Sequence, residues 1–189
     1  AWCDFNAGEH EKALKKLQDV VDYAEKQGKQ MTDLKNEGLH DMVTVFVQLN
    51  RADDAIAYYK AHAGKKKQAN LIGKMAYNLA DAGHHDNAIK TFRYLIGNDP
   101  MQSGAPDFQQ AIIKSYEGLR QREQVKGEIK KLAELYRPGS TWWKANESNK
   151  ETLRNGFNVA EEAMRTMVTE YHQEAQTTKS VETYRLARD

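Results

Sequence analysis

The sequence predicts an all-α fold in which antiparallel helices pair into hairpins and a long helix follows them. The 189 residues include only 3 prolines and 12 glycines, so few positions oppose helix formation. Apolar residues recur three and four positions apart along most of the chain, which is the period of an amphipathic helix. A short pattern that repeats along the first half indicates the turns at which paired helices meet.

The repeated pattern occurs three times. Each copy has a turn residue, then acidic or amide residues, a small alanine, and an apolar residue four positions after the alanine. The successive alanines are 42 and 33 residues apart. A small residue at this place lets two antiparallel helices approach closely beside a tight turn. The turn residues are Gly8, Asn50 and Gly83, and the alanines are Ala13, Ala55 and Ala88.

Amphipathic stretches beside these turns complete the hairpins. Apolar residues at helical spacing occupy 39–46, before the second turn, and 72–79, before the third. Downstream of the third turn, 89–96 closes the unit, and Pro100 follows where a proline is expected to stop a helix.

A fourth helix pair is expected over 106–116 and 125–135, with a turn at 120–122 that lacks glycine. The array of about four pairs then covers 1–136, with the first pair truncated. A connection rich in proline, glycine and tryptophan is expected over 137–147.

The last third of the chain predicts a single long helix over 148–178. Ser148 begins a capping-box sequence that ends at Glu151. We expect one further helix to start at Ser180, so that 180–189 is the beginning of a truncated unit. The apolar face of the long helix is expected to hold Leu153, Phe157, Ala160, Met164, Met167 and Tyr171.

Composition excludes several function classes. The chain has 28 Lys+Arg against 27 Asp+Glu, a net charge of +1, which opposes a nucleic-acid surface. No apolar run approaches the ~18 residues that cross a bilayer, so direct membrane insertion is not expected. Because the chain has neither an initiator Met nor a signal peptide and ends in mid-pattern, we expect a piece of a longer protein whose compartment signal lay upstream.

Residues that could carry chemistry are few and scattered. Cys3, the single cysteine, excludes a disulfide framework and is expected to be a small buried helix residue. His84 and His85 are adjacent and cannot face one ion as an i, i+4 pair would. The basic run 65–67 is interpreted as a charged loop. We therefore predict a chain that is not an enzyme and has no catalytic, cofactor-binding or metal-binding residues.

Trp142 and Trp143 are expected to divide their roles. Neighbouring side chains on a turn seldom point the same way, so one ring should be buried and cap the preceding helix pair while the other stays partly exposed.

The segment 69–100 carries a spaced set of apolar, small and turn residues: Ile72, Met75, Ala76, Leu79, Gly83, His85, Ala88, Phe92, Leu95 and Pro100. With this set the segment resembles a tetratricopeptide repeat (TPR), and the resemblance extends over about 1–136. His85 stands where the family usually has Tyr, and Gln109 stands where it has a large residue. The resemblance implies a right-handed solenoid whose first helices line a concave groove.

Family groove positions, carried onto this chain, imply a set of partner-binding residues. They are mixed in charge and include aromatic residues, which suits an extended peptide or protein partner. The family clamp for a C-terminal carboxylate is not implied, because its places hold residues such as His40 and Gly73. The implied partner-binding residues are Glu37, His40, Thr44, Gln48, Asn70, Tyr77, Asp81 and Lys114, with Asp107, Gln110 and Glu117 beside Lys114.

The segments 137–143 and 170–175 are similar to stretches of long TPR proteins of the Gram-negative cell envelope, some of which belong to surface-motility machinery. This likeness implies a periplasmic or envelope-associated scaffold that binds a protein through its concave face; a cytoplasmic location stays open. The alternative function is an accessory solenoid that positions an enzyme domain located elsewhere in the parent chain. Self-association, through the terminal repeats or the long helix, is compatible with both.

Overall fold

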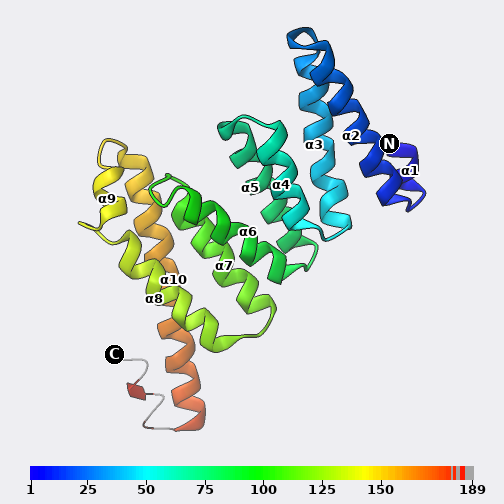
Figure 1. The fold of residues 1–189 in the computed structure, drawn as a ribbon. Coiled ribbons are helices and arrows are strands. Elements are labelled where there is room, and N and C mark those ends of the chain that lie inside the picture. Colours follow the sequence, from blue (N-terminus) through cyan, green and yellow to red (C-terminus); the bar gives the residue numbers. More distant parts are fainter. Residues whose placement is uncertain (180, 182–183, 186–189) are drawn as a thin grey trace. The chain divides into compact units, whose positions relative to one another are not determined.

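The computed structural model describes residues 1–179, 181, 184 and 185 and shows an all-helical chain (Figure 1). These residues form ten α-helices and one 3₁₀ turn, without any strand. The prediction of an all-α fold is therefore confirmed. Ser180, Leu186 and Ala187 of the further unit expected over 180–189 lie outside the described residues.

The chain divides into two compact units, Ala1–Leu95 and Ile96–Asp189, and each is described by itself. In the part of unit 1 that the structure describes, long helices alternate with short turns. The elements are α1 (Trp2–Asn6), α2 (His10–Gln27), the 3₁₀ turn η1 (Lys29–Met31), α3 (Thr32–Gln48), α4 (Ala52–His62), α5 (Lys65–Asp81) and α6 (His85–Asn98).

Four helix pairs share one turn geometry. At Gly8, Asn50, Gly83 and Arg120 the backbone has a positive φ, between 53° and 80°. The amide of each turn residue donates to the carbonyl three positions back, and the next amide donates to the carbonyl five positions before it. This pattern closes the first helix of the pair in the manner of a Schellman motif. The three turns predicted from the pattern are confirmed, and the fourth follows the same geometry without glycine.

The second helices of the four pairs also begin with the same hydrogen bond. Ala13, Ala55, Ala88 and Val125 each stand five positions after the turn residue, and each amide donates to the carbonyl four positions back. The three alanines are fully buried, as predicted. Val125 takes this place in the fourth pair and is half-buried.

Polar contacts between residues 34 to 39 positions apart join successive pairs in unit 1. Among the first helices, Trp2 on α1 donates to Asp41 on α3, and Nζ of Lys74 on α5 lies 2.7 Å from Nε2 of His40 on α3. Among the second helices, Lys90 on α6 pairs with Asp53 on α4. Polar side chains therefore bridge equivalent helices of neighbouring pairs, and α3 and α5 also pack against each other.

The core of unit 2 is formed by three long helices and by a short one that carries a buried tryptophan. Trp142 is 2% exposed, its ring meets Tyr136 edge-on at 5.2 Å, and its Nε1 donates to the carbonyl of Gln102. Trp143 is half-buried, so the predicted division between the two tryptophans is confirmed. The helices are α7 (Ala105–Gly118), α8 (Arg122–Tyr136), α9 (Thr141–Ala145) and α10 (Lys150–Thr178).

The buried face of α10 is rotated from the predicted one. Phe157 and Met164 are 47% and 44% exposed, whereas Gly156 is buried. The reason is the tryptophan ring: a Cβ on Gly156 would lie only 2.7 Å from Trp142, so only glycine fits beneath the ring. The N-cap is Asn149, whose side chain accepts from the Thr152 amide, and not the Ser148 of the predicted capping box.

A further expectation about burial is wrong. Cys3 is exposed, because α1 has only five residues and buries none of them. Within the described residues, no helix combines the length and apolar character that crossing a membrane requires.

Candidate binding clefts

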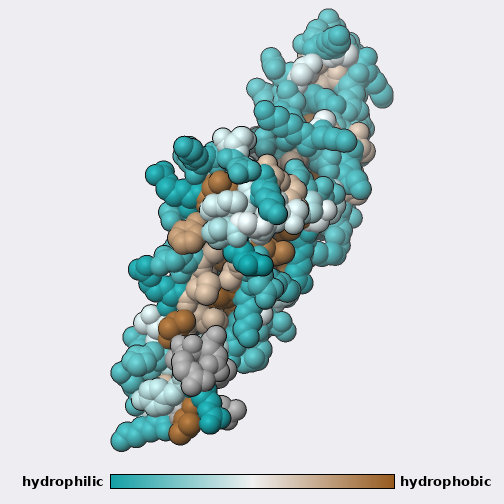
Figure 2. All heavy atoms as spheres, turned by 90° about the vertical axis from the view of Figure 1, so that its left-hand side faces the viewer, coloured by the Kyte–Doolittle hydropathy of each residue, from teal (hydrophilic) through white to brown (hydrophobic). Residues whose placement is uncertain are grey.

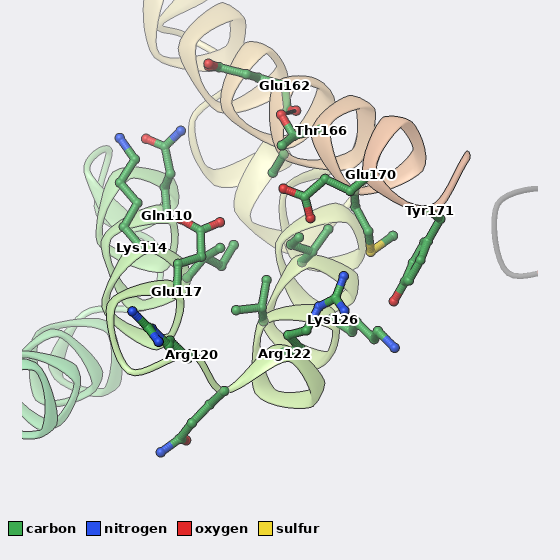
Figure 3. Close-up of a pocket in the computed structure, with 16 residues that line it drawn as sticks. Gln110, Lys114, Glu117, Arg120, Arg122, Lys126, Glu162, Thr166, Glu170 and Tyr171 are labelled. Carbon is green, nitrogen blue, oxygen red and sulfur yellow. Dashed lines mark hydrogen bonds between the residues drawn. The ribbon is translucent and has the colours of Figure 1, made fainter. Parts of the chain in front are cut away.

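A cleft of about 740 Å³ lies between α7, α8 and α10 in unit 2 (Figure 3). Its apolar lining is formed by Ile113, Val125, Ile129, Ala163 and Met167. Charged side chains of both signs surround this lining: Lys114, Glu117, Arg120, Arg122, Lys126, Glu162 and Glu170. An apolar lining with a charged rim suits one face of an amphipathic helix or peptide.

Contacts beside the cleft fix the positions of its walls. The Trp142 ring packs against the Gly156 backbone of α10, and Asn155 donates to both carboxylate oxygens of Asp107 on α7 at 3.1 Å. Nearer the C-terminal end of α10, Arg122, which also lines the cleft, forms an ion pair with Glu174. These contacts hold α10 against α7 and α8 while its Met167 side stays open to the cleft.

Two glutamates from opposite walls face each other across the cleft. Figure 3 shows Glu117 extending from α7 and Glu170 from α10 into the same space. Burial raises the pKa of Glu117, and the charge of Glu170 raises it further, while Lys114 lowers it. A carboxylate in such surroundings is more stable when a cation from a bound partner lies beside it.

The raised pKa predicts a pH-dependent effect of Glu117→Gln. Above the ordinary pKa of 4.5, the folded chain bears a cost for ionising Glu117 that the unfolded chain does not, and the glutamine removes it. We expect the variant to exceed the wild type in stability at pH 7 by up to about 0.5 kcal/mol, since solvent screens a partly exposed group.

Urea unfolding at pH 7 and at pH 4 measures this difference. It should vanish at pH 4, where both states hold the proton. Glu162→Gln, an exposed glutamate of the same cleft, is the matched control. A variant less stable than the wild type at pH 7 would contradict the assignment.

A shallower hollow of about 380 Å³ lies on unit 1. Glu37 and His40 of the predicted partner-binding set line it, together with Asp33, Asn36 and Asp41 of α3. Lys67 closes it from the first turn of α5. The run 65–67 is therefore the start of a helix and not the predicted charged loop, because helical hydrogen bonding already begins at Gly64.

The other predicted partner-binding residues divide between the two units. Gln48, Asn70 and Asp81 are exposed and Thr44 is half-buried on α3 and α5. Tyr77 is 41% exposed and its ring meets Phe92 edge-on at 4.9 Å. In unit 2, Lys114 lines the cleft with Gln110 and Glu117, whereas Asp107 is bound to Asn155.

Metal-ligating side chains also converge at a place that the sequence did not indicate. Asp22 and Glu25 on α2 and His62 on α4 bring one donor atom each to within 4.8 Å of the others. Among the described residues, this trio is the group of potential ligands whose donor atoms lie this close together. His84 and His85, which the sequence did not predict to be a metal site, do not belong to it. No short sequence motif indicates this trio, because His62 follows Glu25 by 37 positions and the residues meet only in the folded chain.

The described residues place the chain in the all-α class, as a set of helix pairs with a long helix after them. Comparison adds no family to that class, since no family model, curated protein or solved structure matches the chain.

Proposed function

We propose that this chain is a non-catalytic protein-interaction module of the TPR type, which binds a peptide or a partner helix on surfaces formed by its helix pairs. The proposal rests chiefly on the cleft of unit 2. Its apolar lining and its rim of both charges offer a partner both hydrophobic burial and paired charges.

The shared turn geometry supports the assignment to helical repeats. Turns at Gly8, Asn50, Gly83 and Arg120 close their helices with the same backbone hydrogen bonds, although their side chains differ. Contacts between equivalent helices of successive pairs, such as His40 with Lys74, are those expected when repeats stack on their neighbours.

The surface character supports a protein partner. The face drawn in Figure 2 carries apolar side chains set between hydrophilic ones. In the cleft, Met167 contributes an adaptable thioether to the lining, and methionine fills irregular contacts with varied partners well. The envelope location expected for the parent chain rests on the sequence resemblance and is part of the same proposal.

A peptide library panned against the full chain tests the proposal. We expect enriched peptides that combine apolar residues with a lysine or arginine, because Glu117 and Glu170 face the cleft. Met167→Arg should weaken the binding of these peptides roughly tenfold or more, since it places a charge in the apolar lining. Fluorescence anisotropy on labelled peptides measures the change.

Two further variants show which surface binds the peptides. Met164→Arg introduces the same charge on an exposed position of the same helix and should leave affinity unchanged. Tyr77→Ala tests the predicted surface of unit 1, where an exposed aromatic ring should contribute about 1–2 kcal/mol to binding. Peptides insensitive to both Met167→Arg and Tyr77→Ala would refute binding on these surfaces, provided that circular dichroism shows intact helices.

A further inference from the structure

Three side chains in unit 1 form a ligand set for a metal ion. Nδ1 of His62, at the end of α4, is 3.1 Å from Oε1 of Glu25 on α2, and a carboxylate oxygen of Asp22 lies within 4.8 Å of both donors. One imidazole nitrogen and two carboxylates suit Zn²⁺, which accepts both nitrogen and oxygen ligands. We propose that Asp22, Glu25 and His62 bind a divalent transition-metal ion, with Zn²⁺ as the ion of reference.

The helices bring these ligands together for simple geometric reasons. Asp22 and Glu25 stand three positions apart on α2, so their side chains lie on one face of the helix. His62 is the last residue of α4, the second helix of the next pair. The two acids are exposed and the histidine is half-buried, so an ion enters from solvent and its fourth position is left to water or to a partner's side chain.

Tyr58 holds the histidine in the orientation that the site needs. Its ring stacks on the His62 imidazole, with the centroids 4.2 Å apart and the planes at 23°. Its hydroxyl is buried and has no hydrogen-bond partner among the described groups. A phenol hydroxyl can donate a hydrogen bond to an oxygen ligand that comes within its reach. Such supporting groups orient metal ligands.

Lys35 occupies the cationic position when no metal is bound. Its Nζ lies 2.8 Å from Oε1 of Glu25, the same oxygen that faces His62. The ion must displace the ammonium, so Lys35 is an internal competitor.

Calorimetric titration of the full chain with ZnCl₂ tests the site. We expect saturable binding of one ion per chain. His62→Gln and Asp22→Asn should each weaken it at least about tenfold, and Lys35→Met should tighten it severalfold because the competitor is gone. His84→Gln is the matched control, a histidine that lies outside the trio, and should leave affinity unchanged.

Thermal unfolding gives a second readout, because an ion that joins α2 to α4 binds only the folded chain. Excess Zn²⁺ should raise the Tm of the wild type and of His84→Gln, but not that of His62→Gln. The proposal is overturned if no saturable binding appears up to ~1 mM Zn²⁺, or if His62→Gln binds as the wild type does. A Lys35→Met variant that binds no tighter would show that Glu25 is not a ligand, which also overturns the three-ligand site. The peptide experiments above are independent of this result.

Discussion

Replacement of Trp142 by alanine should destabilise unit 2 by about 3–5 kcal/mol, the range for deleting a large buried aromatic side chain. The ring is 2% exposed and fills the space between Tyr136 on α8 and the Gly156 backbone of α10. Its indole nitrogen also donates to the Gln102 carbonyl at 2.8 Å. The loss is a large part of the net stability of a domain of this size.

Trp143→Ala is the matched control, because it removes the same side chain from the next position, where the ring is only half-buried. Its cost should be less than half that of Trp142→Ala. Urea unfolding followed by circular dichroism measures both, and hydrogen exchange assigns the loss to α7, α8 and α10. Equal costs for the two variants would contradict the central position of Trp142.

The local patterns of the sequence predicted the turns because the physical cause of each turn is local. A residue that tolerates positive φ, such as Gly8 or Asn50, marks the end of a helix wherever the rest of the chain lies. The burial of Ala88 could be predicted for the same local reason. Its distance from the turn places it where the paired helices are closest. Arg120 adopts the same backbone without being glycine, so the fourth turn carried only a weak signal.

The candidate sites depend on contacts between distant segments and were predicted only in part. Lys114 was placed in a groove lined by first helices, whereas the cleft that it lines also has walls from α8 and α10, and Met167 was assigned to a helix face without reference to any cleft. The face of α10 was misjudged, because the preference for Gly156 over Phe157 arises from a tryptophan ring fourteen positions away. The convergence of Asp22 with His62 likewise arises because side chains of α2 and α4 come within reach of each other, which no short spacing encodes.

The second large effect is expected from Ala88→Leu, which should cost about 1–3 kcal/mol by overfilling the contact between α5 and α6. Ala88 is fully buried, and its amide is fixed by the His84 carbonyl at 3.0 Å. The short turn ties the start of α6 to the end of α5, because the His84 amide donates to the Leu79 carbonyl at 2.8 Å. The helix therefore has little freedom to move outward and admit three more carbon atoms.

Ala57→Leu separates overfilling from any effect of leucine on helix propensity, because Ala57 is exposed in the middle of α4 and leucine is nearly as good a helix former as alanine. Its unfolding free energy should stay within about 0.5 kcal/mol of the wild type. The same substitution at Ala55, the equivalent buried position of the preceding pair, should behave as Ala88→Leu does. If Ala55 and Ala88 both tolerate leucine as well as Ala57 does, close approach of the paired helices is not what selects alanine at these positions. The physical basis of the repeat pattern would then have to be sought elsewhere.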